Sequence, residues 1–264
     1  MGSIRLPGKV LLPIEGRPIL EWMVERVRAS EELDEVVVAT TDLPIDDAIR
    51  NLCREIEVPY LSGHPSDLLD RHLQVARALN ADAVVKIPSD CPLIDPRVID
   101  AVVGAFRFHH PRHAFVSNLH PASWPDGNDV EVVRVDALVQ AWREATRPFQ
   151  REHTTPFIWD RPARFSIGNV RRPGGRGLST SHRLRLDYEE DYRLIATVFE
   201  ALHRPGFPPF SVEEMIGYLD AHPDLQLLNA QHVGSSWTSQ HVDELRTMRR
   251  SAPAVASTSA SGAE

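Results

Sequence analysis

Apolar and polar positions in the first hundred residues alternate between two periods. Short apolar runs rich in β-branched residues have the character of buried strands, and they occur at 35–40, 58–61 and 83–87. Between them, apolar residues recur every three to four positions and predict helices over 19–27, 45–56 and 68–79. Strands that alternate with helices in this way indicate parallel strands covered by their connecting helices.

The rest of the chain is patterned less regularly. Strand-like runs occur at 115–117, 130–133, 165–168 and 183–187. Further helices are predicted over 96–106 and 136–146, from residue 189, and after Ser211, which forms a capping box with Glu214. We therefore expect an α/β fold with a mixed, mostly parallel sheet flanked by helices.

Composition narrows the class of protein. The chain has 264 residues, a formal net charge of -8 and two cysteines. The negative charge argues against a nucleic-acid partner, and two cysteines provide no disulfide framework. No apolar run reaches the roughly 20 residues of a membrane span, and no signal peptide is evident, so we expect a cytoplasmic protein. The small, polar composition of residues 251–264 predicts a disordered tail.

The opening residues, MGSIRLPGK, form a basic, glycine-rich loop that feeds a helix. Gly2, Ser3 and Gly8 permit tight turns, while Arg5 and Lys9 supply two cations. Backbone N–H groups and basic side chains at such a point form a cradle for anions, most often phosphate. The alternative is an exposed basic segment that binds nothing, since short glycine loops match by chance.

A carboxylate follows the clearest buried strand, in the segment PSDCPLIDP. In open α/β sheets the ligand crevice lies outside the carboxyl ends of the strands. Asp90 is therefore placed to hold Mg²⁺ against substrate phosphates, although it could equally shape a turn. Asp95 precedes a proline at the start of a predicted helix and is expected to be its N-cap.

Asp187 occupies a similar position at the end of the run 183–187. It could supply a second metal-binding oxygen, because Mg²⁺ is commonly held by one or two carboxylates with water and phosphates. Asp191 lies in the first turn of the next predicted helix, where acidic residues usually interact with the helix dipole. We expect Asp191 to be structural.

Taken together, these segments resemble a known family. The opening loop is similar to the A-R-x-G-S-x-R-L-P-G-K signature of the cytidylyltransferases that activate sugar acids as CMP conjugates. Within that family, the chain resembles the branch named for spore coat polysaccharide biosynthesis protein F, at DEVVVATTD, SDLLDRHLQVA, SDCPLIDP, WPDGNDVEV, REHTTPFIW and RLDYEEDYRLI. The resemblance covers residues 1–202. It implies a Rossmann-like nucleotidyltransferase domain of the nucleotide-diphospho-sugar transferase type, followed by a helical extension over 203–250.

The resemblance also implies roles for individual residues. Arg5 and Lys9, with Gly2 and Ser3, would hold the CTP triphosphate, and Asp90 and Asp187 look like the family's magnesium carboxylates; Arg5, Lys9 and Asp90 would be catalytic. Further nucleotide contacts correspond to Thr40, Asp67 and Arg71. Residues placed where the acceptor should sit, and whose alternative roles are turn formation and helix capping, are Asp126, Asp129, Glu131, Arg151, Glu152 and His153.

The chain departs from the family pattern in three places. Family members have a short strand, ending in Ala-Arg, before the methionine that corresponds to Met1. We hypothesise that this chain lacks the first, central strand of the sheet and one arginine of the phosphate loop. Ser89 replaces the usual glycine, and Lys86 stands where arginine is frequent. Both changes keep the carboxylate of Asp90 but affect the expected geometry of its loop.

The expected activity is Mg²⁺-dependent transfer of CMP from CTP to an acidic sugar or related acceptor, with release of pyrophosphate, in polysaccharide or glycoconjugate biosynthesis. One alternative is a cytidylyltransferase for a phosphonate or another specialised metabolite. Another is a nucleotide-sugar glycosyltransferase, although Ser89-Asp90-Cys91 is not the D-x-D motif of those enzymes. A nucleotide-binding protein without activity is a third. A homodimer is expected by analogy.

Overall fold

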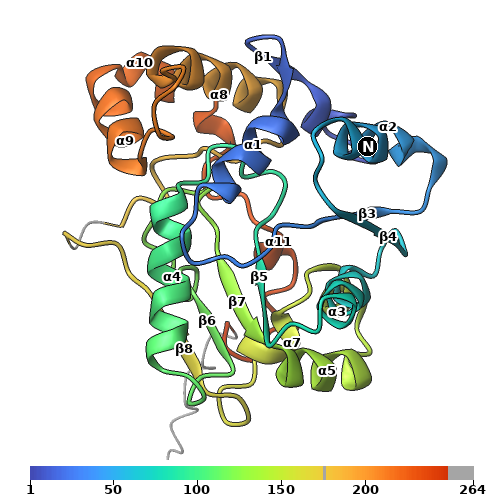
Figure 1. Ribbon diagram of the computed structural model, residues 1–264. Helices are drawn as coiled ribbons and strands as arrows, with labels where there is room; N and C mark the ends of the chain where they lie inside the picture. The colour runs from blue at the N-terminus through green and yellow to red at the C-terminus, as the bar shows by residue number, and fades with distance from the viewer. Residues whose placement is uncertain (175–176, 249–264) are drawn as a thin grey trace, which may run out of the picture. The chain divides into compact units, whose positions relative to one another are not determined.

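The computed structural model describes residues 1–174 and 177–248, which fall into two compact units, divided after Gly234. The first unit contains the strands and all the longer helices of the described residues (Figure 1). The second unit begins at Ser235, and its described part contains the short helix α11 (Trp237–Gln240). The tail predicted over 251–264 lies outside the described residues.

The β/α alternation predicted for the first hundred residues is confirmed. The elements in chain order are α1 (Ile19–Arg28), β3 (Val38–Thr41), α2 (Asp47–Glu55), β4 (Tyr60–Gly63), α3 (Leu68–Ala78) and β5 (Ala83–Lys86). Strand β3 begins three residues later than the apolar run suggested. Its parallel ladder with β4 starts opposite Tyr60, because Pro59 has no N–H with which to extend it.

The opening loop does not run directly into α1, as the sequence had suggested. Gly8, at φ 71°, leads into a 3₁₀ turn (Lys9–Leu11) and then into a small hairpin of β1 (Pro13–Ile14) and β2 (Arg17–Pro18). Glu15 and Gly16 both have positive φ at the tip of the hairpin, as a type I′ turn requires. The loop is thereby turned before α1 begins.

The remaining helices and strands of the first unit continue the α/β pattern. They are α4 (Pro96–Phe108), β6 (Phe115–Ser117), β7 (Glu131–Arg134), α5 (Val135–Glu144), α6 (Pro148–Glu152), α7 (Pro156–Trp159), β8 (Ile167–Asn169), α8 (Glu189–Leu202), α9 (Val212–Ala221) and α10 (Pro223–Gln226). The predicted caps are present: Asp95 accepts the N–H of Arg97 at 2.9 Å, and Ser211 with Glu214 forms a capping box on α9.

The strands form two sheets besides the hairpin. One pairs β3 with β4 in parallel, and the other has the order β5-β7-β6-β8 with both antiparallel and parallel pairs. The α/β class and the mixed sheet are thus confirmed, although parallel and antiparallel pairs are equally represented in these two described sheets. No ladder joins β3 to β5 among the described residues. The hypothesis of an additional strand stays a prediction.

The main core joins segments that are far apart in the chain. Helix α4 packs against β6 and β7, and α8 packs against α9. Residues 203–234 belong to the same compact unit, since Phe210, Met215 and Leu219 are buried in a core with Ile19 and Val198. The expected division between a domain of residues 1–202 and an extension of residues 203–250 stays a prediction. None of the described helices has the length and apolarity needed to cross a bilayer.

Candidate active site

The segment Arg183–Asp187 organises the site through an alternation of side chains. Leu184 and Leu186 are fully buried in the main core, so the alternate residues Arg183, Arg185 and Asp187 face the other way. The prediction of a strand here is wrong, because the segment forms no ladder and makes only an isolated bridge between Arg183 and Asp126. Its backbone instead forms hydrogen bonds to two loops, the one that carries Asp90 and the one that carries Asp126.

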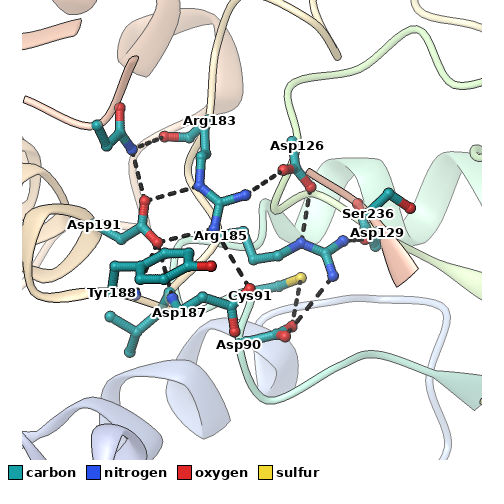
Figure 2. Close-up of polar contacts among 12 residues, drawn as sticks. Asp90, Cys91, Asp126, Asp129, Arg183, Arg185, Asp187, Tyr188, Asp191 and Ser236 are labelled. Atoms are coloured by element: carbon teal, nitrogen blue, oxygen red, sulfur yellow. Dashed lines mark hydrogen bonds and ion pairs between the residues drawn. The ribbon is translucent and has the colours of Figure 1, made fainter. Parts of the chain in front are cut away.

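Two backbone hydrogen bonds attach these loops. The Leu186 N–H donates to the carbonyl of Asp90 at 2.8 Å, and the Leu184 N–H donates to the carbonyl of Asp126 at 2.6 Å. The loop after β5 and the loop before β7 therefore lie against the same short segment. This brings Asp90, Asp126 and Asp187 together from three distant parts of the chain (Figure 2).

Gly127 makes the second attachment possible. It adopts φ 104°, and a Cβ atom placed on it would lie 2.5 Å from the backbone carbon and oxygen of Leu184. No side chain larger than hydrogen fits so close an approach without moving backbone atoms, and the positive φ is itself a conformation that favours glycine. Gly127 therefore fixes the distance between the loop that carries Asp126 and the segment that carries Arg185.

Lys9 connects the opening loop to both predicted metal carboxylates. Its Nζ donates to Asp187 Oδ1 at 2.8 Å and to the carbonyl of Leu186 at 2.6 Å, and it lies 3.8 Å from Asp90 Oδ2. Arg5 Nη2 donates to the same Asp187 oxygen at 2.6 Å. Burial alone would raise the pKa of Asp187, but the charges and hydrogen bonds of Lys9 and Arg5 hold it below the usual value.

The loop that carries Asp90 is anchored from beneath by a buried arginine. Arg26, on α1, donates from Nε to the carbonyl of Ile94 at 2.8 Å and from Nη2 to those of Leu93 and Phe210 at 3.3 and 2.8 Å. Burial lowers the pKa of Arg26 to about 10, which leaves it charged at neutral pH. The backbone of the loop is thus fixed at Leu93 and Ile94, while the Asp90 side chain remains partly exposed.

Cys91 follows Asp90 in this loop and stays a thiol. Its side chain is fully buried, and its Sγ lies 3.6 Å from Asp90 Oδ1. Burial, followed by the neighbouring carboxylates, raises the pKa of the thiol well above its usual range. A neutral thiol is a poor nucleophile and a weak metal ligand, so Cys91 is not suited to either role.

Arg183 is the buried centre of the site. Its guanidinium contacts both oxygens of Asp191, at 2.8 and 2.9 Å, and lies 3.2 Å from Asp126 Oδ2 and 3.4 Å from Asp187 Oδ2. Asn229 bonds both the Arg183 carbonyl and Asp191. Asp191 also accepts the N–H groups of residues 187 and 188, so its expected structural role agrees with its contacts.

Arg185 lies beside Arg183 and is a residue that the sequence analysis missed. Its Nε donates to Asp126 Oδ1 at 2.9 Å, its Nη2 bonds Asp129, and its Nη1 lies 3.8 Å from Asp90 Oδ2 (Figure 2). Burial raises the pKa of Asp129 to about 6, although the charge of Arg185 opposes that rise. The alternation Arg-Leu-Arg-Leu-Asp was the signal that places Arg183, Arg185 and Asp187 on one face.

We call these side chains the charge cluster. Its acidic and basic members are Asp90, Asp126, Asp129, Asp187, Asp191, Arg5, Lys9, Arg183 and Arg185. It brings together the predicted phosphate-binding, metal-binding and acceptor-binding residues at positions 5, 9, 90, 126, 129 and 187. Of its carboxylates, Asp90 is held most loosely, because its side chain contacts a thiol at 3.6 Å and two cations at 3.8 Å within the described part of the chain.

Asp90 and Asp187, the two carboxylates predicted to bind magnesium, are oxygen donors of the kind that Mg²⁺ takes. Asp90 and Asp187 both turn carboxylate oxygens toward Lys9 Nζ, a position that already carries positive charge. Among residues 1–174 and 177–248 there is no group of three or more His, Cys, Asp or Glu side chains suited to a metal. An ion held by two carboxylates would take its other ligands from water and phosphate, as Mg²⁺ commonly does.

The other predicted nucleotide residues lie around β3, β4 and α3. Thr40 Oγ1 is 3.4 Å from Asp46 Oδ2, and Arg71 Nη1 donates to the carbonyl of Ala39 at 3.0 Å. Asp67 caps α3 by accepting the Asp70 N–H at 2.9 Å. In the opening loop, Ser3 Oγ accepts the N–H of Leu6 at 3.3 Å, and a Cβ on Gly2 would meet nothing. Nucleotide contacts by these residues stay predictions.

The remaining predicted acceptor residues are partnered within the protein or exposed. Glu131, on β7, pairs with Lys86 and accepts the hydroxyl of Thr155 at 2.5 Å. Arg151 pairs with Asp67 and also donates to the carbonyl of Trp142 at 2.7 Å. Glu152 is exposed at the end of α6, and His153 is the C-cap of that helix. Contact of these four side chains with an acceptor stays a prediction.

Comparisons with known proteins show the family of this chain. The cytidylyltransferase family model matches residues 1–202. The chain is 30% identical to spore coat polysaccharide biosynthesis protein SpsF of Bacillus subtilis, over 85% of this chain and 92% of that protein. A shorter match, covering 38% of this chain and 39% of the relative at 35% identity, is to 3-deoxy-manno-octulosonate cytidylyltransferase of Pelobacter propionicus.

Among solved structures, a cytidylyltransferase from Leptospira borgpetersenii superposes with a TM-score of 0.80 at 30% identity, covering 85% of this chain and 92% of the other. The family match spans the opening loop, the Asp90 loop and the segment 183–187, which are the three parts that meet in the charge cluster. The chain therefore belongs to the cytidylyltransferase family of nucleotidyltransferases.

Proposed function

We propose that this nucleotidyltransferase moves CMP from CTP to an acidic sugar or a related acceptor, with Asp90 and Asp187 as the carboxylates for a divalent metal. The observation that carries the proposal is the convergence of Asp90 and Asp187 on Lys9 and Arg5. The names of two relatives, a spore coat polysaccharide biosynthesis protein and a 3-deoxy-manno-octulosonate cytidylyltransferase, support an acceptor of the sugar-acid class.

In this reaction an acceptor hydroxyl oxygen attacks the α-phosphorus of CTP. A new P–O bond forms to the acceptor, the bond from the α-phosphorus to the bridging oxygen breaks, pyrophosphate leaves, and the hydroxyl proton passes to solvent. Arg5 and Lys9 offset the charge that builds on the leaving pyrophosphate, because cations fixed near developing charge stabilise it without reorganisation. Arg5 is half-exposed, with side-chain exposure of 51%, and is free to turn from Asp187 toward a phosphate.

Asp90 and Asp187 would hold Mg²⁺. When bound, the ion would neutralise phosphate charge and orient the reacting oxygens. The supporting residues are fixed before substrate arrives: Arg26 holds the Asp90 loop, and Arg183 holds Asp187 on the oxygen that Lys9 does not use. Asp126 and Asp129 lie on the far side of Arg185 from this pair and are proposed to line the acceptor pocket.

The proposal is tested by measuring pyrophosphate release with CTP and each of the other nucleoside triphosphates, in Mg²⁺, over a panel of sugar acids, phosphonates and neutral sugars. We expect release to require CTP, a divalent ion and an acidic acceptor together. Transfer of a sugar from a nucleotide sugar, without pyrophosphate, would identify a glycosyltransferase instead. A preference for another nucleotide would refute the assignment of CTP.

A further inference from the structure

Arg185 has an unusual combination of fixed and unused hydrogen-bonding groups. One edge of its guanidinium, formed by Nε and Nη2, is occupied by Asp126 and Asp129. Its Nη1 makes no hydrogen bond to any residue in the described part of the chain, and its nearest anion is Asp90 Oδ2 at 3.8 Å. The Arg185 side chain is 22% exposed, so it is not closed off from solvent.

The position of this group is set rigidly. Leu184 and Leu186 anchor the backbone on both sides, and Gly127 brings the loop of Asp126 into contact with it. A guanidinium that is held on one edge presents its remaining N–H groups in a fixed plane, with little rotational freedom to lose on binding. Arg185 is therefore preorganised to recognise a planar or multidentate anion.

The surroundings of Nη1 identify which substrate it faces. Asp90 Oδ2 lies 3.8 Å from Lys9 Nζ and 3.8 Å from Arg185 Nη1. Lys9 comes from the opening loop, on the proposed triphosphate side, whereas Arg185 is bonded to the proposed acceptor residues Asp126 and Asp129. Nη1 thus stands on the acceptor side of the proposed metal carboxylate, where the attacking molecule must lie.

We propose that Arg185 is the anchor for an anionic group of the acceptor, a carboxylate or a phosphonate, and that it sets the preference of this enzyme for acidic over neutral acceptors. The inference rests on the proposed function and deepens it. Charge-assisted hydrogen bonds from arginine to such oxygens are strong and directional. Asp126 and Asp129 hold the Arg185 cation in place whether or not an acceptor is bound.

The test compares Arg185→Gln and Arg185→Lys with Arg164→Gln, a control at an exposed arginine paired with Glu144. We would measure KM for CTP and for acceptors in matched sets: a sugar acid, the corresponding neutral sugar and a phosphonate. Assays at pH 7.5 keep Asp129 ionised, since its pKa is about 6. Thermal melts and calorimetric binding of CTP verify that each variant is folded and loads nucleotide.

For Arg185→Gln we expect KM for the acidic acceptor to rise roughly ten- to a hundredfold, the size of a lost hydrogen bond to a charged group, with KM for CTP changed less than about twofold. The preference for acid over neutral sugar should collapse, and Arg185→Lys should recover part of it. A comparison of KM for the sugar acid with KM for the phosphonate shows which of the two anions Arg185 binds.

Three outcomes would overturn the inference. If Arg185→Gln lowers kcat with acceptor KM unchanged, Arg185 only positions Asp90 and Asp126. If the wild-type protein prefers neutral acceptors, Arg185 binds no acceptor anion, although the cytidylyl transfer itself would stand. If the wild-type protein releases no pyrophosphate from CTP with any acceptor, the proposed function fails, and this inference fails with it.

Discussion

Asp129 and Glu131 are two residues apart, both are buried, and both have a basic partner, yet their electrostatics are opposite. Burial raises the pKa of Asp129 to about 6 in spite of Arg185. Burial also acts to raise the pKa of Glu131, but the charge and hydrogen bond of Lys86, together with the Thr155 hydroxyl, bring it below its usual value. Two carboxylates in one segment, each with a basic partner, thus lie in two different environments.

The difference lies in how completely each region satisfies its own charges. Glu131 has Lys86 on one oxygen and Thr155 on the other, and its side chain is only 4% exposed. In the charge cluster, Arg183 and Arg185 are shared among several aspartates, and Asp90 has no ion pair closer than 3.8 Å among the described residues. We call Lys86 and Glu131 a closed pair, because both oxygens of Glu131 have a partner within the protein. Such a pair stabilises the fold, whereas the incompletely paired charge cluster leaves groups available for substrate.

The largest effect expected from this comparison is on stability, at the closed pair. Lys86→Met should lower the free energy of unfolding by about 3–5 kcal/mol, because it leaves the Glu131 carboxylate buried without its partner. Chemical denaturation measures the loss. The double variant Lys86→Met/Glu131→Leu should be less destabilised than the single one, since it removes the orphaned charge as well. If Lys86→Met were as stable as the wild type, the buried Glu131 carboxylate would not depend on Lys86.

In the charge cluster, the largest effect should be on catalysis. Lys9→Ala and Asp90→Asn should each lower kcat for pyrophosphate release roughly a hundredfold or more, the usual result of removing one fixed electrostatic contact at a reacting phosphate. The control is Arg172→Gln, at a site where an arginine pairs with exposed Glu213. Full activity in both Lys9→Ala and Asp90→Asn would exclude the proposed assignment.

The backbone contact that builds the cluster can be tested separately. Gly127→Ala should lower the free energy of unfolding by about 3 kcal/mol, since the added carbon meets the Leu184 backbone and the positive φ is strained. Gly206 is the matched control: it has φ 81° with nothing within 4 Å of a built Cβ, so Gly206→Ala should cost only about 1 kcal/mol. Equal losses, measured by denaturation, would show that crowding at Gly127 is unimportant.

The smallest effect is a pair of pH dependences with opposite sign. Because the folded pKa of Asp129, about 6, exceeds its ordinary 3.8, the folded protein binds that proton more tightly, and stability falls as pH rises through this window. The folded pKa of Glu131 lies below its ordinary 4.5, so its stabilisation is complete above 4.5 and is lost as pH falls through the folded value.

Denaturation of Asp129→Asn and Glu131→Gln against the wild type, across a pH series, separates the two. The free energy of unfolding of Asp129→Asn relative to the wild type should rise between pH 4 and pH 6, the window that the pKa of Asp129 sets. That of Glu131→Gln should fall as pH rises toward 4.5 and then stay constant. A shift of the same sign in both variants would contradict the contrast between the two environments.

Local patterning predicted most of the longer helices and strands, although it missed the β1–β2 hairpin and wrongly predicted a strand over 183–187. The period of apolar positions identified α1, α3 and β5, and capping chemistry located the starts of α4 and α9, because these depend on neighbours a few residues away. The sequence could not predict which strands pair. The order β5-β7-β6-β8, with two antiparallel ladders, depends on pairs such as Ala83 with Arg134 and Phe115 with Ile167, which lie far outside the few residues that a local pattern covers.

For the candidate site too, some residues were predicted from the sequence and others were found only in the folded structure. The sequence by itself predicted Arg5, Lys9, Asp90 and Asp187 as residues for phosphate and metal, since their types and their positions in loops suit that chemistry. Only the tertiary structure decided that Arg185 joins them and that Glu131 is closed off by Lys86. The physical reason is that the composition of a segment sets which charges are available, while their pairing depends on distances that only the folded chain brings within reach.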